Sequence, residues 1–277
     1  MSIEATLFTE PIGIIAGNRT LPLVFARQAR NLGAGRIVAV AFKSETDPGL
    51  EQLVDETVWI NVGQLTKLIS AFTERQVRRC VMLGQIAPSN LFDVRPDLRA
   101  VGVLLRLKEK NAQTIFGAVA DELRKDGVEL IEATPWLRPI MAAAGFQLGP
   151  ALSASEREDV QFGFRVAKEI SRLAIGQLVV VKDGTVLAVE GFEGTDKCLM
   201  RGGELSGKRG GAVAVKVARD DHDMRFDVPC VGPQTLLTCA TVGIRVLAIE
   251  ANRNLVLESE EVERLANRRK ITLATVG

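Results

Sequence analysis

Short apolar runs alternate with amphipathic stretches through the first half of the chain. Residues 21–32 and 65–77 carry apolar side chains at helical spacing, and a further helix is expected over 111–125. The apolar runs of strand length are residues 12–17, 36–42, 57–62, 80–84 and 128–133. Strands that alternate with helices of this length indicate a parallel sheet covered on both faces. Because parallel crossovers are right-handed, we expect an α/β fold that begins with a Rossmann-like doubly wound sheet.

Proline and glycine interrupt this pattern between residues 134 and 154, where we place the junction of two domains. Ser153 or Ser155 is suited to cap the helix that follows over 156–173. Two apolar runs around Asp183-Gly184 predict a β-hairpin. The remaining expected elements are a strand over 212–217, a helix after Gly232, and strands over 245–250 and 271–276. The predicted division is a Rossmann-like domain over 1–134, a linker over 135–154 and a second α/β domain over 155–277.

Composition narrows the functional classes. The formal net charge is +1, tyrosine is absent and aromatic residues make up 5%, which excludes bulk electrostatic binding of nucleic acid and base-stacking platforms. No apolar run approaches the roughly 20 residues that span a bilayer, whereas contact with a membrane surface stays open. The amino terminus lacks the basic region and apolar core of a signal peptide. Four cysteines without CxxC spacing predict reduced thiols in a cytoplasmic protein rather than a zinc site.

Candidate chemistry concentrates in residues 190–232. Two acidic clusters flank a glycine-rich stretch and an apolar strand, and basic side chains are interleaved with them. Carboxylate oxygens suit a hard cation such as Mg²⁺, and arginine and lysine suit phosphate. The acidic clusters are Glu190, Glu193 and Asp196, and Asp220, Asp221, Asp223 and Asp227. Together these groups indicate metal-assisted chemistry on a phosphorylated substrate.

Each of these residues also has an ordinary interpretation. Asp223, Arg225 and Asp227 alternate, so in an extended segment they would share one face, but a half-buried strand edge shows the same alternation. Asp196 and Arg201 could equally be a helix cap and a surface salt bridge. His222, the only histidine, stands in an acidic run that could bind metal, and we favour a solvated loop with a surface imidazole.

The first strand-to-helix turn is a second candidate site. Gly13 and Gly17, with Asn18 next to them, would let backbone amides approach a phosphate or nucleotide at a helix terminus. Any α/β domain tends to be glycine-rich at this turn, which is the alternative explanation. The GxGxxG fingerprint is not matched, so dinucleotide-dependent oxidoreductase chemistry is the weakest interpretation, and a titration showing no binding of NAD or NADP would remove it.

At these motifs the chain resembles the LpxI-type UDP-2,3-diacylglucosamine diphosphatases. Residues 175–196 resemble the family's hairpin followed by an EGTD signature, which is followed by an arginine. Residues 216–232 resemble its lysine-bearing strand and QDxRFDxP segment, and 243–251 its closing strand. Residues 12–22 and 82–86 match more loosely. The resemblance covers nearly the whole chain, with its specific motifs in 175–251.

The resemblance implies hydrolysis of the UDP-2,3-diacylglucosamine pyrophosphate in lipid A biosynthesis. Water would attack the α-phosphorus and release UMP and 2,3-diacylglucosamine 1-phosphate. The resemblance also implies Mg²⁺ (or Mn²⁺ or Co²⁺), a homodimer, and cytoplasmic protein with peripheral contact to the inner membrane. We expect Asp223 and Asp227, with Asp196, to be catalytic residues that act as metal ligands or water-orienting groups. The expected substrate-binding residues are Arg201, Arg225, Lys216 and Thr195, with Gly13, Gly17 and Asn18 at the nucleotide or its phosphate.

The chain departs from the family pattern at a few positions. Asn111, Ala112 and Gln113 stand where the family has a Gly-Asp-Asp run, His222 stands where glutamine is usual, and Cys230 replaces threonine. The missing carboxylates motivate an alternative function, namely a diverged homologue that binds a phosphoglycolipid or nucleotide without turnover. Both functions predict binding, so turnover distinguishes them.

Overall fold

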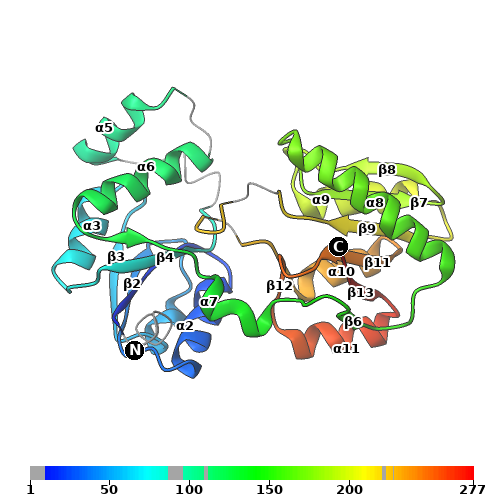
Figure 1. Ribbon diagram of the computed structural model, residues 1–277, viewed down its shortest axis with the longest axis horizontal. Helices are drawn as coiled ribbons and strands as arrows, with labels where there is room; N and C mark the ends of the chain where they lie inside the picture. Colours follow the sequence, from blue (N-terminus) through cyan, green and yellow to red (C-terminus); the bar gives the residue numbers. More distant parts are fainter. Residues whose placement is uncertain (1–9, 87–95, 109–111, 220–222, 227) are drawn as a thin grey trace. The chain divides into compact units, whose positions relative to one another are not determined.

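The computed structural model describes residues 10–86, 96–108, 112–219, 223–226 and 228–277. These residues form two compact units, each with its own sheet (Figure 1). The first unit contains the described residues up to Arg138 together with 223–226, and the second contains the rest. Among the described residues, no helix has the length and apolar character needed to cross a membrane.

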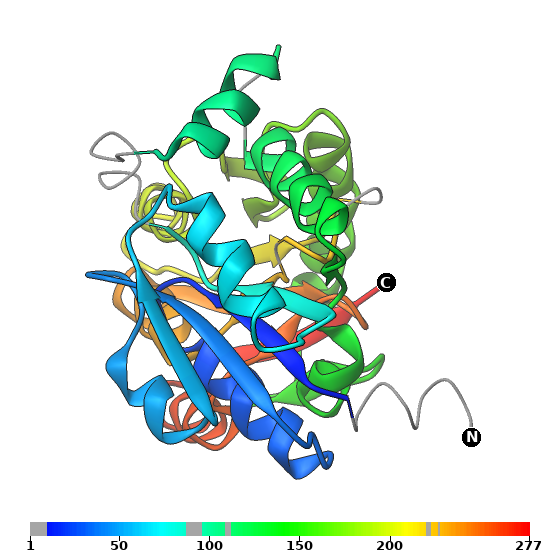
Figure 2. The ribbon, with the colours of Figure 1, turned by 90° about the vertical axis from the view of Figure 1, so that its left-hand side faces the viewer.

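A five-stranded parallel sheet forms the first unit (Figure 2). Its strands, in the spatial order β3-β2-β1-β4-β5, are β3 Glu56–Ile60, β2 Ile37–Phe42, β1 Ile12–Ala16, β4 Arg79–Leu83 and β5 Glu129–Leu130. Its helices are α2 Leu21–Asn31, η1 Pro48–Gln52, α3 Leu65–Thr73, α5 Leu98–Arg106, α6 Ala112–Lys125 and α7 Thr134–Leu137. The order reverses between β1 and β4, as in doubly wound sheets. The predicted Rossmann-like class is therefore confirmed.

Alternate strand residues feed two cores on the two faces of this sheet. On one face, Ile15 and its neighbours pack against α3, α5 and α6. On the other, Phe25 of α2 lies 5.5 Å from Trp136 of α7 between ring centroids, and both side chains are fully buried. This two-sided covering explains why the strands read as continuous apolar runs. The strand expected over 128–133 is shorter, because the chain turns into α7 at Thr134, next to Pro135.

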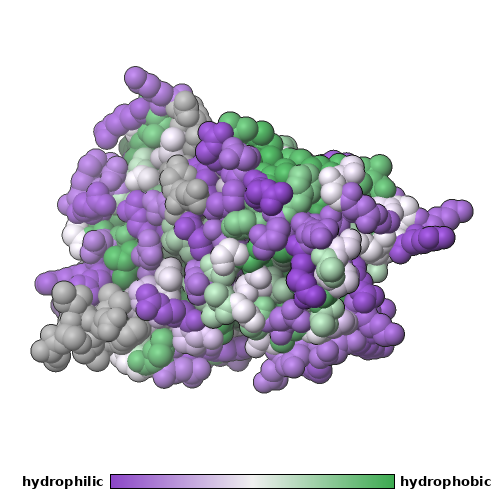
Figure 3. Space-filling view, turned by 45° about the vertical axis from the view of Figure 1, so that its right-hand side comes forward, coloured by the Kyte–Doolittle hydropathy of each residue, from purple (hydrophilic) through white to green (hydrophobic). Residues whose placement is uncertain are grey.

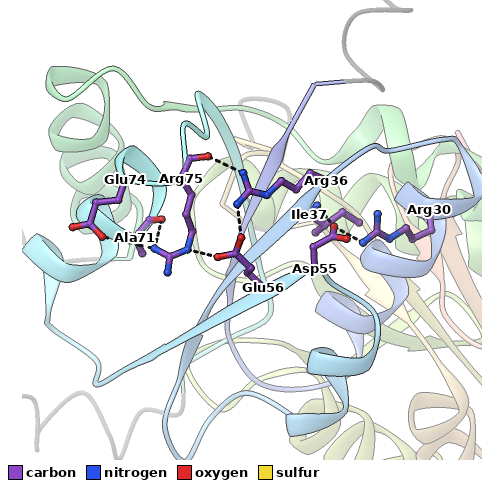
Figure 4. A network of polar contacts seen from close by, with 8 residues as sticks. All are labelled: Arg30, Arg36, Ile37, Asp55, Glu56, Ala71, Glu74 and Arg75. Carbon is purple, nitrogen blue, oxygen red and sulfur yellow. Dashed lines mark hydrogen bonds and ion pairs between the residues drawn. The ribbon is translucent and has the colours of Figure 1, made fainter.

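Ion pairs secure the edge of this sheet where β2 and β3 begin (Figure 4). Glu56 pairs with both Arg36 and Arg75, and the Arg75 Nε lies 2.7 Å from Glu56 Oε2. These hydrogen bonds hold the pKa of Glu56 below its usual value. Ligands of parallel α/β sheets bind at the opposite edge, beyond the carboxyl ends of the strands. We therefore interpret this network as structural.

The second unit is built on a six-stranded mixed sheet. In spatial order its strands are β6 Gln147–Leu148, β13 Thr272–Val276, β11 Ile244–Glu250, β9 Ala212–Lys216, β7 Leu178–Lys182 and β8 Thr185–Val189. A separate parallel pair consists of β10 Cys230–Val231 and β12 Leu255–Val256. The remaining elements are η2 Arg138–Ile140 and the helices α8 Ala154–Arg172, α9 Thr195–Leu205, α10 Pro233–Thr241 and α11 Ser259–Arg269.

Two local predictions for this unit are confirmed. Ser153 caps α8 and forms a capping box with Glu156. Asp183 and Gly184 join β7 to β8 with φ angles of 49° and 71°, as a tight hairpin requires. The carboxylate of Asp159 accepts hydrogen bonds from the amides of Asp183 and Gly184, both at 2.8 Å. Helix α8 and the hairpin are thereby tied together.

Helices cover both faces of the second sheet. Helix α8 packs on one face through Val160, Ala167 and Ile170. Helices α9, α10 and α11 contribute to the core on the other face. The predicted linker 135–154 contains parts of α7, all of η2 and β6. The domain limits 1–134 and 155–277 stay a prediction.

One segment leaves its sequence neighbours and packs in the first unit. Residues 223–226 follow β9 in the chain, yet the ring of Phe226 lies 6.1 Å from that of Phe116 on α6, and Phe226 joins the α3/α5/α6 core. The extended conformation expected for 223–227 is wrong for the described part. Residues 224–226 form a turn, closed by a 3.1 Å hydrogen bond from the Phe226 amide to the Asp223 carbonyl oxygen.

The face shown in Figure 3 is mostly hydrophilic, with hydrophobic residues gathered in places on it. Large apolar side chains are exposed in both units. Among the residues that the structure describes, the most exposed of these are Phe192, Leu98 and Leu105, at 109%, 92% and 78% of their reference areas. Two of these three lie on the single helix α5.

Candidate functional site

The connection between β8 and α9 builds a polar cluster in the second unit. Glu190 follows the edge strand β8 and is 9% exposed. Its Oε1 accepts the Thr195 hydroxyl at 2.9 Å, and its Oε2 accepts the Gln177 amide at 3.1 Å. A buried carboxylate with both oxygens hydrogen-bonded is a rigid acceptor. Glu190 therefore fixes the orientation of Thr195 at the first residue of α9.

Lys216 brings a positive charge to this cluster. It is the last residue of β9, and its Nζ donates to the Thr195 hydroxyl oxygen at 3.5 Å and to the Cys230 carbonyl oxygen at 3.3 Å. The amino terminus of a helix also favours anions, because its first amides lack intrahelical acceptors. The ammonium and the start of α9 together favour a phosphate group. We call Glu190, Thr195 and Lys216 the α9 cluster.

Arg201 and Glu193 form an ion pair beside the α9 cluster. An Arg201 guanidinium nitrogen lies 2.5 Å from Glu193 Oε1 and donates to the Val189 carbonyl oxygen at 2.8 Å. The hydrogen bond from Arg201 holds the pKa of the Glu193 carboxyl group below its usual value. Asp196, one residue into α9, is exposed. Arg201 is thus placed near the turn by a partner that sequence reasoning had not assigned to it.

Two of the thiols near this cluster, those of Cys198 and Cys239, are unreactive at neutral pH. Burial raises the pKa of Cys198, in the first turns of α9, to about 12, and that of Cys239, on α10, to about 12. The fraction of thiolate at neutral pH is therefore negligible, and neither thiol is suited to act as a nucleophile.

The first strand-to-helix turn is tied to its neighbour by backbone hydrogen bonds. The Gly17 amide donates to the Leu83 carbonyl oxygen, and the Asn18 amide donates to the Gln85 carbonyl oxygen, both at 2.7 Å. Gly84 has a φ of 85°, and a Cβ there would lie 2.4 Å from the Asn18 carbonyl oxygen. Two of the amides expected to hold phosphate are therefore already occupied.

Gly13 and the Asn18 side chain also have structural partners. Gly13 lies inside β1, where a Cβ would come within 2.6 Å of the Phe72 ring. Its lack of a side chain serves packing of α3 on the sheet. Asn18 donates from Nδ2 to Glu45 Oε2 at 2.7 Å, which links the loops after β1 and β2. Gly17 and Asn18 do lie at the ligand-binding edge of the sheet, and Gly13 lies within it.

Asp223 and Arg225 form an ion pair in the first unit. Arg225 Nε lies 2.9 Å from Asp223 Oδ1, and a terminal guanidinium nitrogen lies 2.6 Å from Oδ2. The hydrogen bonds that Arg225 donates to Asp223 raise the pKa of Arg225, so its charge is secure. The guanidinium also stands 5.0 Å from the Phe226 ring centroid. The packing of Phe226 thus anchors both charged groups.

Comparison with known proteins assigns the chain to a family. Residues 11–140 match the LpxI N-terminal domain, and residues 143–274 match the LpxI C-terminal domain. A relative, UDP-2,3-diacylglucosamine pyrophosphatase LpxI of Caulobacter vibrioides, is 32% identical over 262 residues, or 91% of this chain and 92% of the relative.

The chain belongs to the LpxI family. The resemblance carried by the EGTD and RFD motifs is confirmed. Residues 223–226 fall within the match to the LpxI C-terminal domain, yet they pack in the first unit. In this LpxI chain, residues 223–226 therefore belong to the C-terminal domain by sequence match and to the first unit by packing, where Phe226 joins the core.

Two solved structures with some similarity to the chain share little with it. The dCMP deaminase from the cyanophage S-TIM5 is 13% identical, with 45% of this chain and 100% of that chain covered, at a TM-score of 0.27. The glycinamide-RNase-transformylase T from Mycobacterium tuberculosis is 12% identical, with 65% and 44% covered, at a TM-score of 0.26. Scores this low carry no argument for the LpxI chain.

The predicted metal ligands do not form one described cluster. Asp223 belongs to the first unit and Asp196 to the second, while Asp227 and His222 lie outside the described residues. Within the parts of the chain that the structure describes, no group of three His, Cys, Asp or Glu residues could hold a metal ion. The side chains of residues 111–113, where the family has carboxylates, are likewise not described.

Sequence reasoning missed the role of one residue and the partners of another. Glu190 was recognised only as part of an acidic cluster, although it organises Thr195. A usable signal was its place directly after an apolar strand, because such a carboxylate is buried as the next loop folds over it. The pairing of Asp223 with Arg225 had no comparable signal, since it depends on the turn at 224–226.

Proposed function

We propose that the chain hydrolyses the pyrophosphate bond of UDP-2,3-diacylglucosamine to UMP and 2,3-diacylglucosamine 1-phosphate, a step of lipid A biosynthesis. The observation that carries the substrate is the match, over 91% of the chain, to a relative named as a pyrophosphatase of this compound. The α9 cluster supports a phosphate ligand independently, because it combines an ammonium group with a helix amino terminus. A cytoplasmic location, contact with the inner membrane and a homodimer belong to the same proposal.

The reaction joins a water oxygen to the α-phosphorus and breaks the bond from that phosphorus to the bridging oxygen. The bridging oxygen and its electron pair leave with the sugar 1-phosphate, and the water proton passes to solvent or a nearby base. The negative charge that develops on the phosphate oxygens requires positive groups. Lys216, Arg201 and Arg225 supply such charges, and Thr195 supplies a hydroxyl held in one orientation by Glu190.

Carboxylate oxygens have the donor chemistry that Mg²⁺ prefers, and Asp223 of the first unit and Asp196 of the second both carry them. In the structure both oxygens of Asp223 accept hydrogen bonds from Arg225. Asp223, with Asp196 and Asp227, would hold Mg²⁺, which when bound would neutralise phosphate charge and make the bound water more acidic. Arg225 holds the Asp223 carboxylate in one orientation through hydrogen bonds to both of its oxygens.

Product analysis tests the proposal. Purified protein is incubated with UDP-2,3-diacylglucosamine and Mg²⁺ in ¹⁸O-labelled water, and the products are identified by mass. We expect the label in UMP and no turnover after EDTA treatment. Label only in the sugar phosphate would reject attack at the α-phosphorus, and full turnover after metal stripping would reject the role of Mg²⁺.

Lys216→Met tests the phosphate role of the α9 cluster within the same assay. Removing the ammonium while keeping the length of the side chain should lower kcat/KM roughly 100-fold, equivalent to about 2.7 kcal/mol of transition-state stabilisation. Lys182→Met is the matched control, because Lys182 also ends a strand of this sheet and donates to a carbonyl oxygen, that of Ser206 at 2.8 Å. Binding of substrate without turnover by the wild-type chain would favour the non-catalytic homologue instead.

A further inference from the structure

Helix α5 packs on the first unit with its small apolar side chains and leaves its large ones outside. Ala100 and Val103 are 9% and 6% exposed and join the core with α3 and α6. Leu98 and Leu105 are 92% and 78% exposed. A helix that docks for core burial alone would place its leucines inward. The exposed leucines therefore call for a partner outside this core.

The outward orientation is held in place by polar contacts. Asp97 caps the helix, accepting the Ala100 amide at 2.9 Å and the Thr66 amide, at the start of α3, at 2.7 Å. Arg99 reaches α6, where its guanidinium lies 2.8 Å from Glu122 and 2.5 Å from Asp126. These contacts prevent α5 from turning its leucines into the unit by a simple roll.

The exposed leucines form one apolar strip. Leu98 and Leu105 are seven residues apart, which is nearly two helical turns and about 10 Å along one face. Val101 and Gly102, both half-buried, lie between them on that side. We call Leu98, Val101, Gly102 and Leu105 the α5 strip.

Positive charge lies at the carboxyl end of the strip. The Arg106 side chain is 73% exposed, and Lys108 is also exposed. Glu122 lies 3.8 Å from a guanidinium nitrogen of Arg106 and is also paired with Arg99 and with Lys125. An apolar strip with an exposed arginine and an exposed lysine at one end matches the surface of a bilayer that contains anionic lipids.

We propose that the α5 strip is the surface by which this chain docks on an anionic lipid bilayer. Leu98 and Leu105 enter the boundary between headgroups and acyl chains, while Arg106 and Lys108 meet lipid phosphates. The inference rests on the proposed function in one respect, because a diacylated substrate resides in a bilayer and the protein must meet it there. A second copy of the chain is the competing occupant of this strip.

Vesicle sedimentation tests this surface without depending on turnover. The full chain is mixed with vesicles of phosphatidylethanolamine and phosphatidylglycerol, or of phosphatidylcholine alone. The test variant is Leu98→Ser with Leu105→Ser. The matched control is Leu173→Ser with Ile175→Ser, which removes two leucine-sized side chains that are 58% and 50% exposed in the second unit. Thermal unfolding and circular dichroism establish that each variant is folded.

We expect the wild type to sediment with phosphatidylglycerol vesicles, and the α5 variant to lose at least tenfold in partition coefficient while the control keeps it. Arg106→Gln with Lys108→Gln should weaken binding to phosphatidylglycerol vesicles and abolish the difference between the two vesicle types. Equal sedimentation of wild type and α5 variant, or no sedimentation of the wild type, would overturn the inference. So would a change in oligomeric state of the α5 variant in lipid-free analytical ultracentrifugation, which would assign the strip to a second copy.

Hydrolysis assays separate this inference from the proposed function. The folded α5 variant should hydrolyse detergent-dispersed substrate like the wild type and be at least tenfold slower on vesicle-embedded substrate. An equal loss in both formats would contradict docking through the strip. A wild type that binds vesicles but hydrolyses nothing would refute the proposed function and leave the docking surface standing.

Discussion

Two of the strand-to-helix turns of this molecule, those from β1 to α2 and from β8 to α9, are both glycine-rich in sequence and differ in what surrounds them. The turn from β1 to α2 contains Gly17, and the turn from β8 to α9 contains Gly191 and Gly194. In the first, amides of the turn donate to carbonyl oxygens at the end of β4 and in the loop that follows it. In the second, a buried glutamate orients a threonine hydroxyl beside a lysine ammonium. Glycine at the start of a helix is thus compatible with backbone closure as well as with a ligand site.

The neighbouring strand explains the difference. β1 lies in the middle of a parallel sheet, so the loop after β4 leaves the same edge and closes on the turn at Gly84. β8 lies at the edge of its sheet and pairs only with the antiparallel β7. No parallel neighbour there sends a loop across the turn. Side chains from β9 and α9 fill the space instead.

The largest expected effect on activity concerns Asp223, which lies in the C-terminal domain by sequence match and packs in the first unit. Asp223→Asn keeps the shape but removes the charge that balances Arg225 and suits a cation, so kcat should fall at least about 100-fold, or ~2.7 kcal/mol. Steady-state kinetics measure the loss. Asp126→Asn is the control, because it breaks another arginine–aspartate ion pair of the first unit, the one between Asp126 and Arg99. Near wild-type turnover of Asp223→Asn would make its pairing purely structural.

Disruption of the α9 cluster should have the next largest effect. Glu190→Gln and Thr195→Val should each lower kcat/KM about tenfold, because both leave Lys216 without its oriented neighbour. The double variant should lose little more than either single one, since the two residues act through one hydrogen bond. Independent, multiplicative losses in this double-mutant cycle would show that Glu190 does not act through Thr195.

Gly84→Ala tests the closed turn of the first unit. Its φ of 85° and the contact of 2.4 Å with Asn18 predict a loss of about 3 kcal/mol in the free energy of unfolding. Urea unfolding measures it. Gly127→Ala has a similar φ of 80° with no atom within 4 Å, so it separates backbone strain from the close contact. A loss no larger than that of Gly127→Ala would show that the two loops are not tightly closed.

The smallest expected effect is a pH dependence at the second turn. Arg201 holds the pKa of Glu193 below its usual 4.5, so the pair stabilises the fold above that value and is lost as the pH falls through the lowered folded pKa. Glu193→Gln should remove this part of the acid-induced fall in melting temperature. An unchanged slope between about pH 5 and pH 3 would show that the exposed pair contributes nothing.

Local chemistry was the part of the fold that could be predicted. Apolar runs, the Asp183-Gly184 hairpin and the Ser153 cap depend on residues close in sequence, and the structure contains all of them. The arrangement of the candidate site was harder to predict from the sequence. Asp196, Thr195, Arg201 and Lys216 do gather around one turn, but Gly13 turned out to pack against Phe72. Gly13 lies inside β1 and faces α3, and neither the end of β1 nor the helix that covers this position can be read from the local sequence.

The sequence by itself determined the alternation of strands and helices, the parallel first sheet and the family, because each is carried by periodicity or by contiguous motifs. Tertiary structure decided the partners of the charged groups. Lys216 of β9 donates to the hydroxyl of Thr195 on α9, 21 residues away in the chain, and Phe226, which follows the Asp223–Arg225 pair, packs beside Phe116 of α6. Such partners depend on packing between distant segments, which no local pattern of residues specifies.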